Sequence, residues 1–213
     1  MVHPTLLAHA SRRHPTTARW LLVGLVAVFL LASCSSKNSL QPADVQRFIV
    51  TKEVTDNLSR LIAFVSTGEQ GIETLAKQRP GSANAQTLLA GARVGWQNVL
   101  AEVTNFTPAQ AKVVPGLANA VVASRLAAIQ WMNALNVAGP KLSKGTVNSF
   151  ADLSGTFARA RSQEAKARAA LAATVATLAR MACQEETAHP DLAASGAAAA
   201  DCTSASQLAA QTP

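Results

Sequence analysis

Residues 83–105, ANAQTLLAGARVGWQNVLAEVTN, contain the most regular helical pattern in the chain. Their apolar side chains recur at intervals of three and four residues, which places them on one face of an α-helix. That face comprises Leu88, Leu89, Ala92, Trp96, Val99, Leu100, Val103 and Phe106. The opposite face carries Gln86, Arg93, Gln97 and Thr104. A helix with this pattern packs against other helices, so we expect a core helix of a bundle with Trp96 as its central packing residue.

Gly91 and Gly95 form a Gly-x-x-x-Gly spacing on the flank of this helix. Each glycine in a helix interior costs about 1 kcal/mol relative to alanine. Close approach of a second helix would offset that cost. We expect this neighbour to be a helix of the same domain, and a helix of a partner protein is the alternative, since the motif matters most inside membranes.

A first helix is predicted before this stretch, over residues 42–67, with proline at its first position. Its apolar face comprises Val54, Leu58, Leu61, Ile62 and Val65. Gly68 and Gly71 follow, so residues 69–79 are either a continuation or a separate short helix. The sequence Pro80-Gly81-Ser82 predicts a firm break.

After residue 105 the sequence predicts a short helix and then a long one. Thr107, Pro108 and Gln110 fit a capping box with proline at the first helical position. The next helix is expected over residues 117–137, with an end at Gly139-Pro140. Its apolar face comprises Leu117, Val121, Ala128, Ile129, Met132 and Leu135. Arg125 falls in the middle of this face, where a carboxylate is expected to meet it because an unpaired buried arginine is costly.

The last predicted helix begins near Thr146 and persists to Glu186. Its apolar line is Phe150, Leu153, Phe157, Ala160, Ala167, Leu171, Val175 and Leu178. Glu164 interrupts this line, and local pairing with Arg161 or Arg168 is one interpretation. The more specific hypothesis is a buried ion pair between Arg125 and Glu164 across an antiparallel hairpin. A polar ligand pocket around the same charges is the less favoured alternative.

Together these patterns predict an all-α fold, an antiparallel bundle of about four main helices with a long C-terminal helix, over residues 42–186. Alanine is abundant, and it is the best helix former. Residues 187–213 are expected to form a flexible tail rich in Ala and Ser. Cys183 and Cys202 are expected to form a disulfide in an exported protein. Two free thiols, or a mixed disulfide with a partner, remain as alternatives.

The N-terminus has the three parts of an export signal. Basic residues Arg12, Arg13 and Arg19 precede the apolar run of residues 20–31, and Leu31-Ala32-Ser33-Cys34 follows. The run is shorter than the roughly 20 apolar residues that a membrane span requires. Leu31 to Cys34 resemble the lipobox of bacterial lipoproteins. The resemblance implies a signal peptide over residues 1–33 and lipidation of Cys34.

Residues 34–41 would then be a polar tether between the lipid and the bundle. The resemblance implies that the protein is held by its lipid on the exported side of the cell membrane or outer membrane. Acyl chains anchor a protein to a membrane because each methylene buried in the bilayer contributes about 0.8 kcal/mol to the free energy of binding. A retained membrane helix is one alternative, and an ordinary signal peptide that leaves Cys34 as a plain thiol is another.

The charge and histidine content of the exported part limit the classes of function that it can have. Removing the three arginines of the signal from the formal charge of +7 leaves +4, which does not indicate nucleic-acid binding. His3, His9 and His14 lie in the signal, so His189 alone remains in the exported part. Nucleophilic catalysis that depends on histidine needs an imidazole held in place, and a zinc site needs several His or Cys ligands. We therefore expect no catalytic residues, no metal and no cofactor.

The predicted function is a non-enzymatic binding or scaffolding module of the cell envelope, with an envelope protein as its partner. The alternative is a carrier or sensor of a small apolar or anionic ligand held between the helices. A cavity lined by Trp96, Trp131, Met132 and Phe157 would favour this alternative, and a tightly filled core would count against it.

Overall fold

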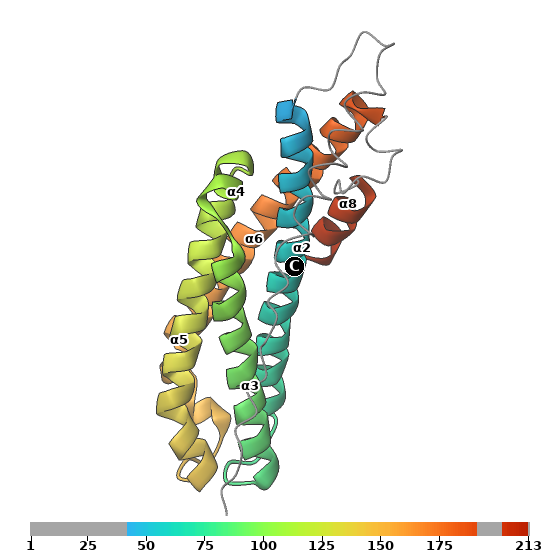
Figure 1. Ribbon diagram of the computed structural model, residues 1–213. Helices are drawn as coiled ribbons and strands as arrows, with labels where there is room; N and C mark the ends of the chain where they lie inside the picture. The colour runs from blue at the N-terminus through green and yellow to red at the C-terminus, as the bar shows by residue number, and fades with distance from the viewer. Residues whose placement is uncertain (1–41, 191–201, 213) are drawn as a thin grey trace, which may run out of the picture. The chain divides into compact units, whose positions relative to one another are not determined.

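The computed structural model describes residues 42–190 and 202–212, and every regular element in this part of the chain is a helix (Figure 1). The elements are α2 (Pro42–Ala76), α3 (Ala83–Glu102), η1 (Val103–Asn105), α4 (Pro108–Val113), α5 (Leu117–Lys144), η2 (Phe150–Leu153), α6 (Ser154–Ala188) and α8 (Cys202–Gln211). The predicted all-α fold is confirmed. The predicted signal peptide, Cys34 and the tether of residues 34–41 lie outside the described residues.

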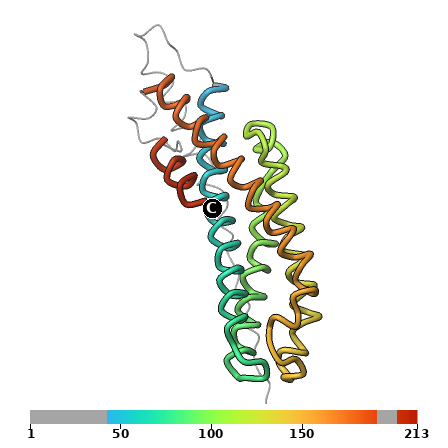
Figure 2. Tube along the Cα trace, turned by 180° about the vertical axis from the view of Figure 1, so that it is seen from behind, coloured from blue at the N-terminus to red at the C-terminus, as the bar shows by residue number. Residues whose placement is uncertain are grey.

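The long helices α2, α3, α5 and α6 follow one another up and down and pack into a bundle (Figures 1 and 2). Figure 2 shows α6 crossing obliquely, so that it lies along α5 near its start and along the first turns of α2 near its end. An ion pair between Arg47 of α2 and Glu185 of α6, at 3.0 Å, joins the two helices at that end. α8 packs beside α2 and α6. Within the described ranges, none of the helices combines the length and apolar character that a membrane span requires.

Stacked aromatic rings form the centre of the core. Trp96 of α3 lies 5.8 Å from Trp131 of α5, and Trp131 lies 5.5 Å from Phe157 of α6, measured between ring centroids. Phe150 of η2 stacks on Phe157 at 4.7 Å. Pairs of this kind contribute about 0.5–1.5 kcal/mol each beyond the area they bury. The rings therefore tie three helices together, with Trp131 between Trp96 and Phe157. Trp96 is fully buried as the pattern of residues 83–105 predicts, but it lies at one end of the row of rings.

The apolar line predicted for the last helix is buried along its whole length. All eight of its members are less than a tenth exposed: Phe150, Leu153, Phe157, Ala160, Ala167, Leu171, Val175 and Leu178. The line begins in η2, where Ser149 and Asp152 form a capping box, and continues through α6. The predicted capping box of Thr107 and Gln110 is also present, at the start of α4.

Helix α2 continues through Gly68 and Gly71 to Ala76, so residues 69–76 are a continuation of the first helix. The two glycines lie where α3 comes closest. A Cβ on Gly68 would lie 2.7 Å from the ring of Trp96, and one on Gly71 would lie 3.0 Å from the Cα of Ala92. On α3, Gly95 lies against Gly68, whereas Gly91 has nothing within 4 Å of its Cβ position. The neighbour expected for the Gly-x-x-x-Gly motif is therefore a helix of the same domain, and it contacts Gly95 alone.

The end predicted for the next helix at Gly139-Pro140 is wrong, because α5 continues through Pro140 to Lys144. A proline inside a helix leaves a carbonyl of the preceding turn without its usual donor and strains the backbone there. The carbonyl left without a donor is that of Asn136, four residues before the proline. Arg93 of α3 donates a hydrogen bond of 3.2 Å to the adjacent carbonyl of Leu135. Gly139 leaves room for this guanidinium, since a Cβ there would lie 2.8 Å from its Nη2 atom. The helix continues past the proline along its contact with α3 and ends at Lys144, before Gly145, whose φ is 64°.

The prediction of a flexible tail over residues 187–213 is wrong at both of its described ends. α6 extends to Ala188, and residues 202–211 form α8. Ala205 and Leu208 of α8 are buried, Leu208 in the main core and Ala205 against Ala182. A short alanine-containing segment forms a helix here because its apolar side packs on the bundle.

Candidate functional site

The hypothesis of a buried pair between Arg125 and Glu164 is wrong. Arg125 lies on the exposed side of α5, whereas the side chain of Glu164 is 16% exposed and bonds to other residues. The register of the hairpin explains the error. Because α5 continues past Pro140, the turn lies further along the chain than predicted. Glu164 therefore lies opposite Trp131, and its Oε2 accepts a hydrogen bond of 2.7 Å from the indole Nε1.

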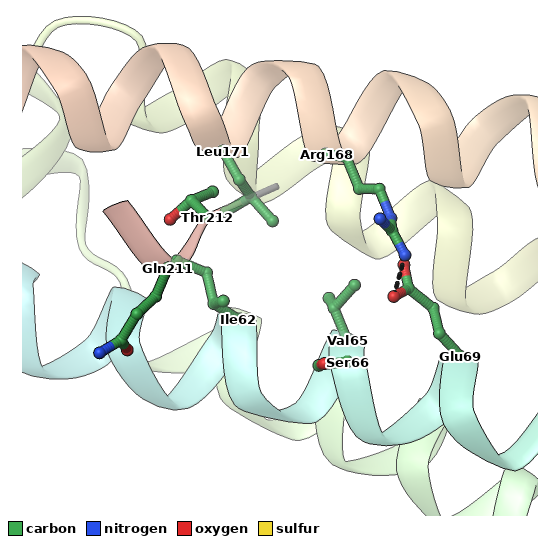
Figure 3. Close-up of a pocket in the computed structure, with 8 residues that line it drawn as sticks. All are labelled: Ile62, Val65, Ser66, Glu69, Arg168, Leu171, Gln211 and Thr212. Carbon is green, nitrogen blue, oxygen red and sulfur yellow. Dashed lines mark hydrogen bonds and ion pairs between the residues drawn. The ribbon is translucent and has the colours of Figure 1, made fainter. Parts of the chain in front are cut away.

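Glu164 belongs to a cluster of polar groups from three helices, which we call the carboxyl cluster: Glu69, Trp131, Glu164 and Arg168. Arg168 contacts both carboxylates, with its Nε 3.6 Å from Oε1 of Glu164 and hydrogen bonds to Glu69 on α2. Figure 3 shows the guanidinium reaching from α6 to the Glu69 carboxylate. Local pairing of Glu164 with Arg168 is thus present, and Arg168 also ties α6 to α2.

The cluster changes the acidity of Glu164. Burial, a hydrogen bond with the Glu69 carboxyl and the negative charge of Glu69 together raise the pKa of Glu164 from an ordinary value of 4.5 to about 7. The indole N–H of Trp131 and the charge of Arg168 act in the opposite direction but are weaker. Two carboxyls that face one guanidinium cannot both ionise without repulsion, so one of them keeps its proton to a higher pH.

A small cavity of about 40 Å³ lies beside the Glu69–Arg168 pair (Figure 3). It is lined by Ile62, Val65, Ser66, Glu69, Arg168, Leu171, Gln211 and Thr212. A volume of about 10–15 Å³ on this measure holds one water, so the cavity has room for a few waters and is far too small for an organic ligand. The cavity gives water a place next to the cluster, at the point where the end of α8 meets α2 and α6.

The partnership of Glu69 and Glu164 was not predicted from the sequence. Glu164 stands out in the sequence as a charge inside an apolar line, but the sequence analysis did not predict that Glu69 would be buried beside it. A signal for Glu69 does exist, since it follows Ile62 and Val65 at helical spacing along the inner flank of α2. Recognising it requires knowing that α2 continues through Gly68.

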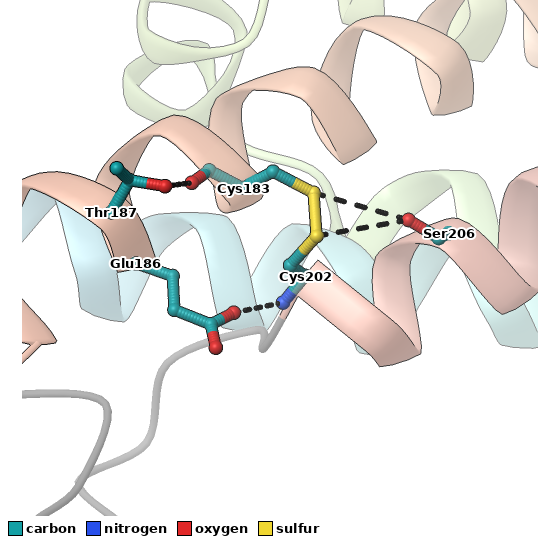
Figure 4. The surroundings of a disulfide bond; sticks show 5 residues. All are labelled: Cys183, Glu186, Thr187, Cys202 and Ser206. Carbon is teal, nitrogen blue, oxygen red and sulfur yellow. Dashed lines mark hydrogen bonds between the residues drawn. A yellow bond between two sulfur atoms is a disulfide. The ribbon is translucent and has the colours of Figure 1, made fainter.

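Cys183 and Cys202 form a disulfide, with their Cα atoms 4.4 Å apart (Figure 4). It fastens the start of α8 to α6. Glu186 accepts a hydrogen bond of 2.8 Å from the backbone N–H of Cys202, and a carboxylate at a helix N-terminus is favourable. Ser206 lies within 4.0 Å of both sulfur atoms. The end of α8 lies beside the carboxyl cluster, where Gln211 and Thr212 line the same cavity as Glu69 and Arg168.

A second candidate is the solvent-exposed apolar part of α3 and α5. Four large apolar residues on it are roughly half exposed: Val94 (53%), Val122 (57%), Leu126 (44%) and Val137 (57%). We call these four residues the α3–α5 surface. α3 carries two charged residues, Arg93 and Glu102, and α5 carries three, Arg125, Lys141 and Lys144. In contrast, α2 and α6 carry eight charged residues each.

The space in which an interior ligand would lie is filled. Trp96, Trp131 and Phe157 are at most 1% exposed and contact one another. Among residues 42–190 and 202–212, no group of three or more His, Cys, Asp or Glu side chains is placed to hold a metal ion. His189 lies against the ring of Phe48, with centroids 6.0 Å apart. Comparison of the chain with protein-family models, with curated proteins and with solved structures finds no match.

Proposed function

We propose that this protein is a lipid-anchored, non-enzymatic lipoprotein of the cell envelope that binds another envelope protein through the α3–α5 surface. The lipobox-like residues Leu31 to Cys34 support the anchor. The anchor would hold the bundle on the exported side of the cell membrane or outer membrane through the tether of residues 34–41. The bundle then serves as a binding or scaffolding module.

The exposed apolar residues of the α3–α5 surface carry this proposal. Scattered apolar residues are common on protein surfaces, but the four most exposed of the large ones lie on α3 and α5. These helices carry two and three charged residues, against eight each on the other long helices α2 and α6. Depletion of charge together with exposed apolar side chains is typical of the central part of a protein interface. The partner that fits is a protein with an apolar, uncharged helix, because helical surfaces accept another helix in their grooves.

The filled aromatic core weighs against the alternative of a ligand carrier. A small molecule between the helices would need a cavity lined by Trp96, Trp131 and Phe157, and these rings occupy that space themselves. The lone His189 likewise gives no support to an enzymatic role.

The anchor is tested by intact mass of the protein extracted from membranes, next to a Cys34→Ala variant. The expected mass corresponds to residues 34–213 plus acyl chains, and the variant is expected to lose both the acyl mass and processing at Cys34. An unmodified mass that Cys34→Ala leaves unchanged would overturn the anchor.

The α3–α5 surface is tested by site-specific photo-crosslinking in the producing cells. A crosslinking residue at Val94 and, separately, at Val122 should trap the same envelope protein. A matched position at Lys166, which is exposed on the charged helix α6, should not. Leu126→Glu should abolish both adducts without changing the helical circular dichroism. Adducts that form equally at Lys166, or that survive Leu126→Glu, would contradict this assignment.

A further inference from the structure

The carboxyl cluster plays no part in the proposed binding surface, and its cations and anions are unequal in number. Here a single guanidinium, Arg168, meets two carboxylates from different helices, Glu69 of α2 and Glu164 of α6. The side chains of the two acids are 11% and 16% exposed. The group therefore has one negative charge too many when both acids are ionised.

We propose that Glu69 and Glu164 form a proton-binding site in which the two carboxyls share one proton, so that the α2–α6 contact responds to pH. With the proton bound, the pair carries one negative charge, which Arg168 neutralises. When the proton leaves to water, a second negative charge appears between α2 and α6. The repulsion acts across the contact that Arg168 otherwise closes.

The groups around Glu164 favour this assignment from every helix that packs there. Trp131 of α5 donates its indole N–H at 2.7 Å, so this hydrogen bond holds Glu164 at a fixed position. On α6, Arg168 is the cation that faces Glu164, and Arg161, one turn before Glu164, is exposed. On α2, Glu69 is the facing charge.

The end of α8 closes the cluster without adding a charge from its described residues. It contributes Gln211 and Thr212 to the rim of the cavity next to Glu69 and Arg168 (Figure 3). The cavity has room for water, which can take up the proton. Loss of the proton is therefore expected to hydrate the cavity and to loosen α2, α6 and the end of α8 from one another.

The indole N–H of Trp131 gives a direct readout, because its resonance senses the charge of the carboxylate that it contacts. We would record ¹H–¹⁵N spectra of the full chain in detergent between pH 5 and pH 9. The indole signals of Trp20, Trp96 and Trp131 are assigned with single Trp→Phe variants. The Trp131 signal is expected to move with a midpoint near pH 7.

Two variants separate a shared proton from simple burial. Glu164→Gln should abolish the transition, since the amide does not titrate. Glu69→Gln should keep the transition but move its midpoint to lower pH by a unit or more, because the neighbouring negative charge is gone. A Trp131 signal that does not move in the wild type would overturn the proposal. A midpoint that Glu69→Gln leaves unchanged would also overturn it. This second test does not depend on Glu164→Gln, so it remains valid if that variant fails to fold.

Discussion

Gly95 of α3 and Gly68 of α2 lie backbone against backbone, so closely that a Cβ on Gly95 would be 2.9 Å from the Cα of Gly68. This contact sets how near the two helices come to each other. It also allows the ring of Trp96 to lie over Gly68, where a Cβ would lie 2.7 Å from the ring. The aromatic stack at the centre of the core therefore depends on two residues that have no side chain.

Gly95→Ala is expected to destabilise the bundle although alanine is the better helix former. The added methyl group meets backbone atoms, which cannot move aside without separating α2 from α3. Overpacking of this kind costs roughly 1–3 kcal/mol, and the gain in helix propensity, about 1 kcal/mol, offsets only part of it. The free energy of unfolding from chemical denaturation measures the effect.

Gly91→Ala is the matched control on the same helix. Gly91 has nothing within 4 Å of its Cβ position, so the propensity gain should appear undiminished. We expect an increase of about 0.5–1 kcal/mol in the free energy of unfolding. Equal effects of the two substitutions would show that the Gly68 contact has no energetic role.

Periodicity was enough to predict the class of the fold and most of its inward faces. The apolar line from Phe150 to Leu178 is buried at every predicted position, because spacing along a helix is a local property. The predictions of the end of α5 and of the candidate site failed because they depend on contacts between helices, which spacing along one helix does not reveal. Pro140 does not end α5, and this part of α5 packs on α3, where Arg93 bonds to the carbonyl of Leu135 beside Gly139.

That one error propagated into the candidate site. An earlier turn would have placed Arg125 opposite Glu164, whereas the real register places Trp131 there. Both charges of the true cluster other than Glu164 come from positions that the sequence does not single out as buried. Glu69 is the clearest case, because its role depends on how α2 packs against α6.

Arg125 and Arg168 are predicted to differ strongly in their effect on stability. Arg125→Glu changes an exposed position and should alter the free energy of unfolding by no more than about 0.5 kcal/mol. Arg168→Met leaves Glu69 and Glu164 without their shared cation, and a loss of about 1–3 kcal/mol is expected at pH 8. The loss should be smaller at pH 5, where Glu164 is protonated. Chemical denaturation at the two pH values measures both variants, and a large effect of Arg125→Glu would contradict the prediction that this exposed position contributes little to stability.

The disulfide is predicted to stabilise the bundle through the end of the chain. Cys183 and Cys202 are 19 residues apart, and closing a loop of that length corresponds to about 3 kcal/mol in the chain-entropy treatment. Replacing both cysteines with serine should lower the melting temperature by roughly 6–12 °C for a domain of this size. Wild-type protein under reducing conditions should match the double variant, and the variant itself should not respond to reductant. A variant as stable as the oxidised wild type would mean that α8 docks without help from the bond.

The stability of the bundle is predicted to fall as pH rises from about 4.5 to 7, because the folded protein keeps a proton on Glu164 that the unfolded chain releases. Its pKa is raised to about 7 in the folded protein, while the unfolded chain titrates near 4.5. Between these values the folded state binds more protons than the unfolded state, so the contribution of this group is complete below pH 4.5 and is lost by about pH 7.5. A shift of this size corresponds to at most about 3 kcal/mol.

Other carboxylates titrate in the same range, so the wild type is compared with Glu164→Gln at each pH. The difference between their free energies of unfolding isolates Glu164, because all other groups are common to both proteins. The free energy of unfolding of the wild type minus that of Glu164→Gln should decrease as pH rises and then level off above pH 7.5. A constant difference across the range would mean that Glu164 is ionised already at pH 4.5 and that the second negative charge is accommodated by Arg168 without cost.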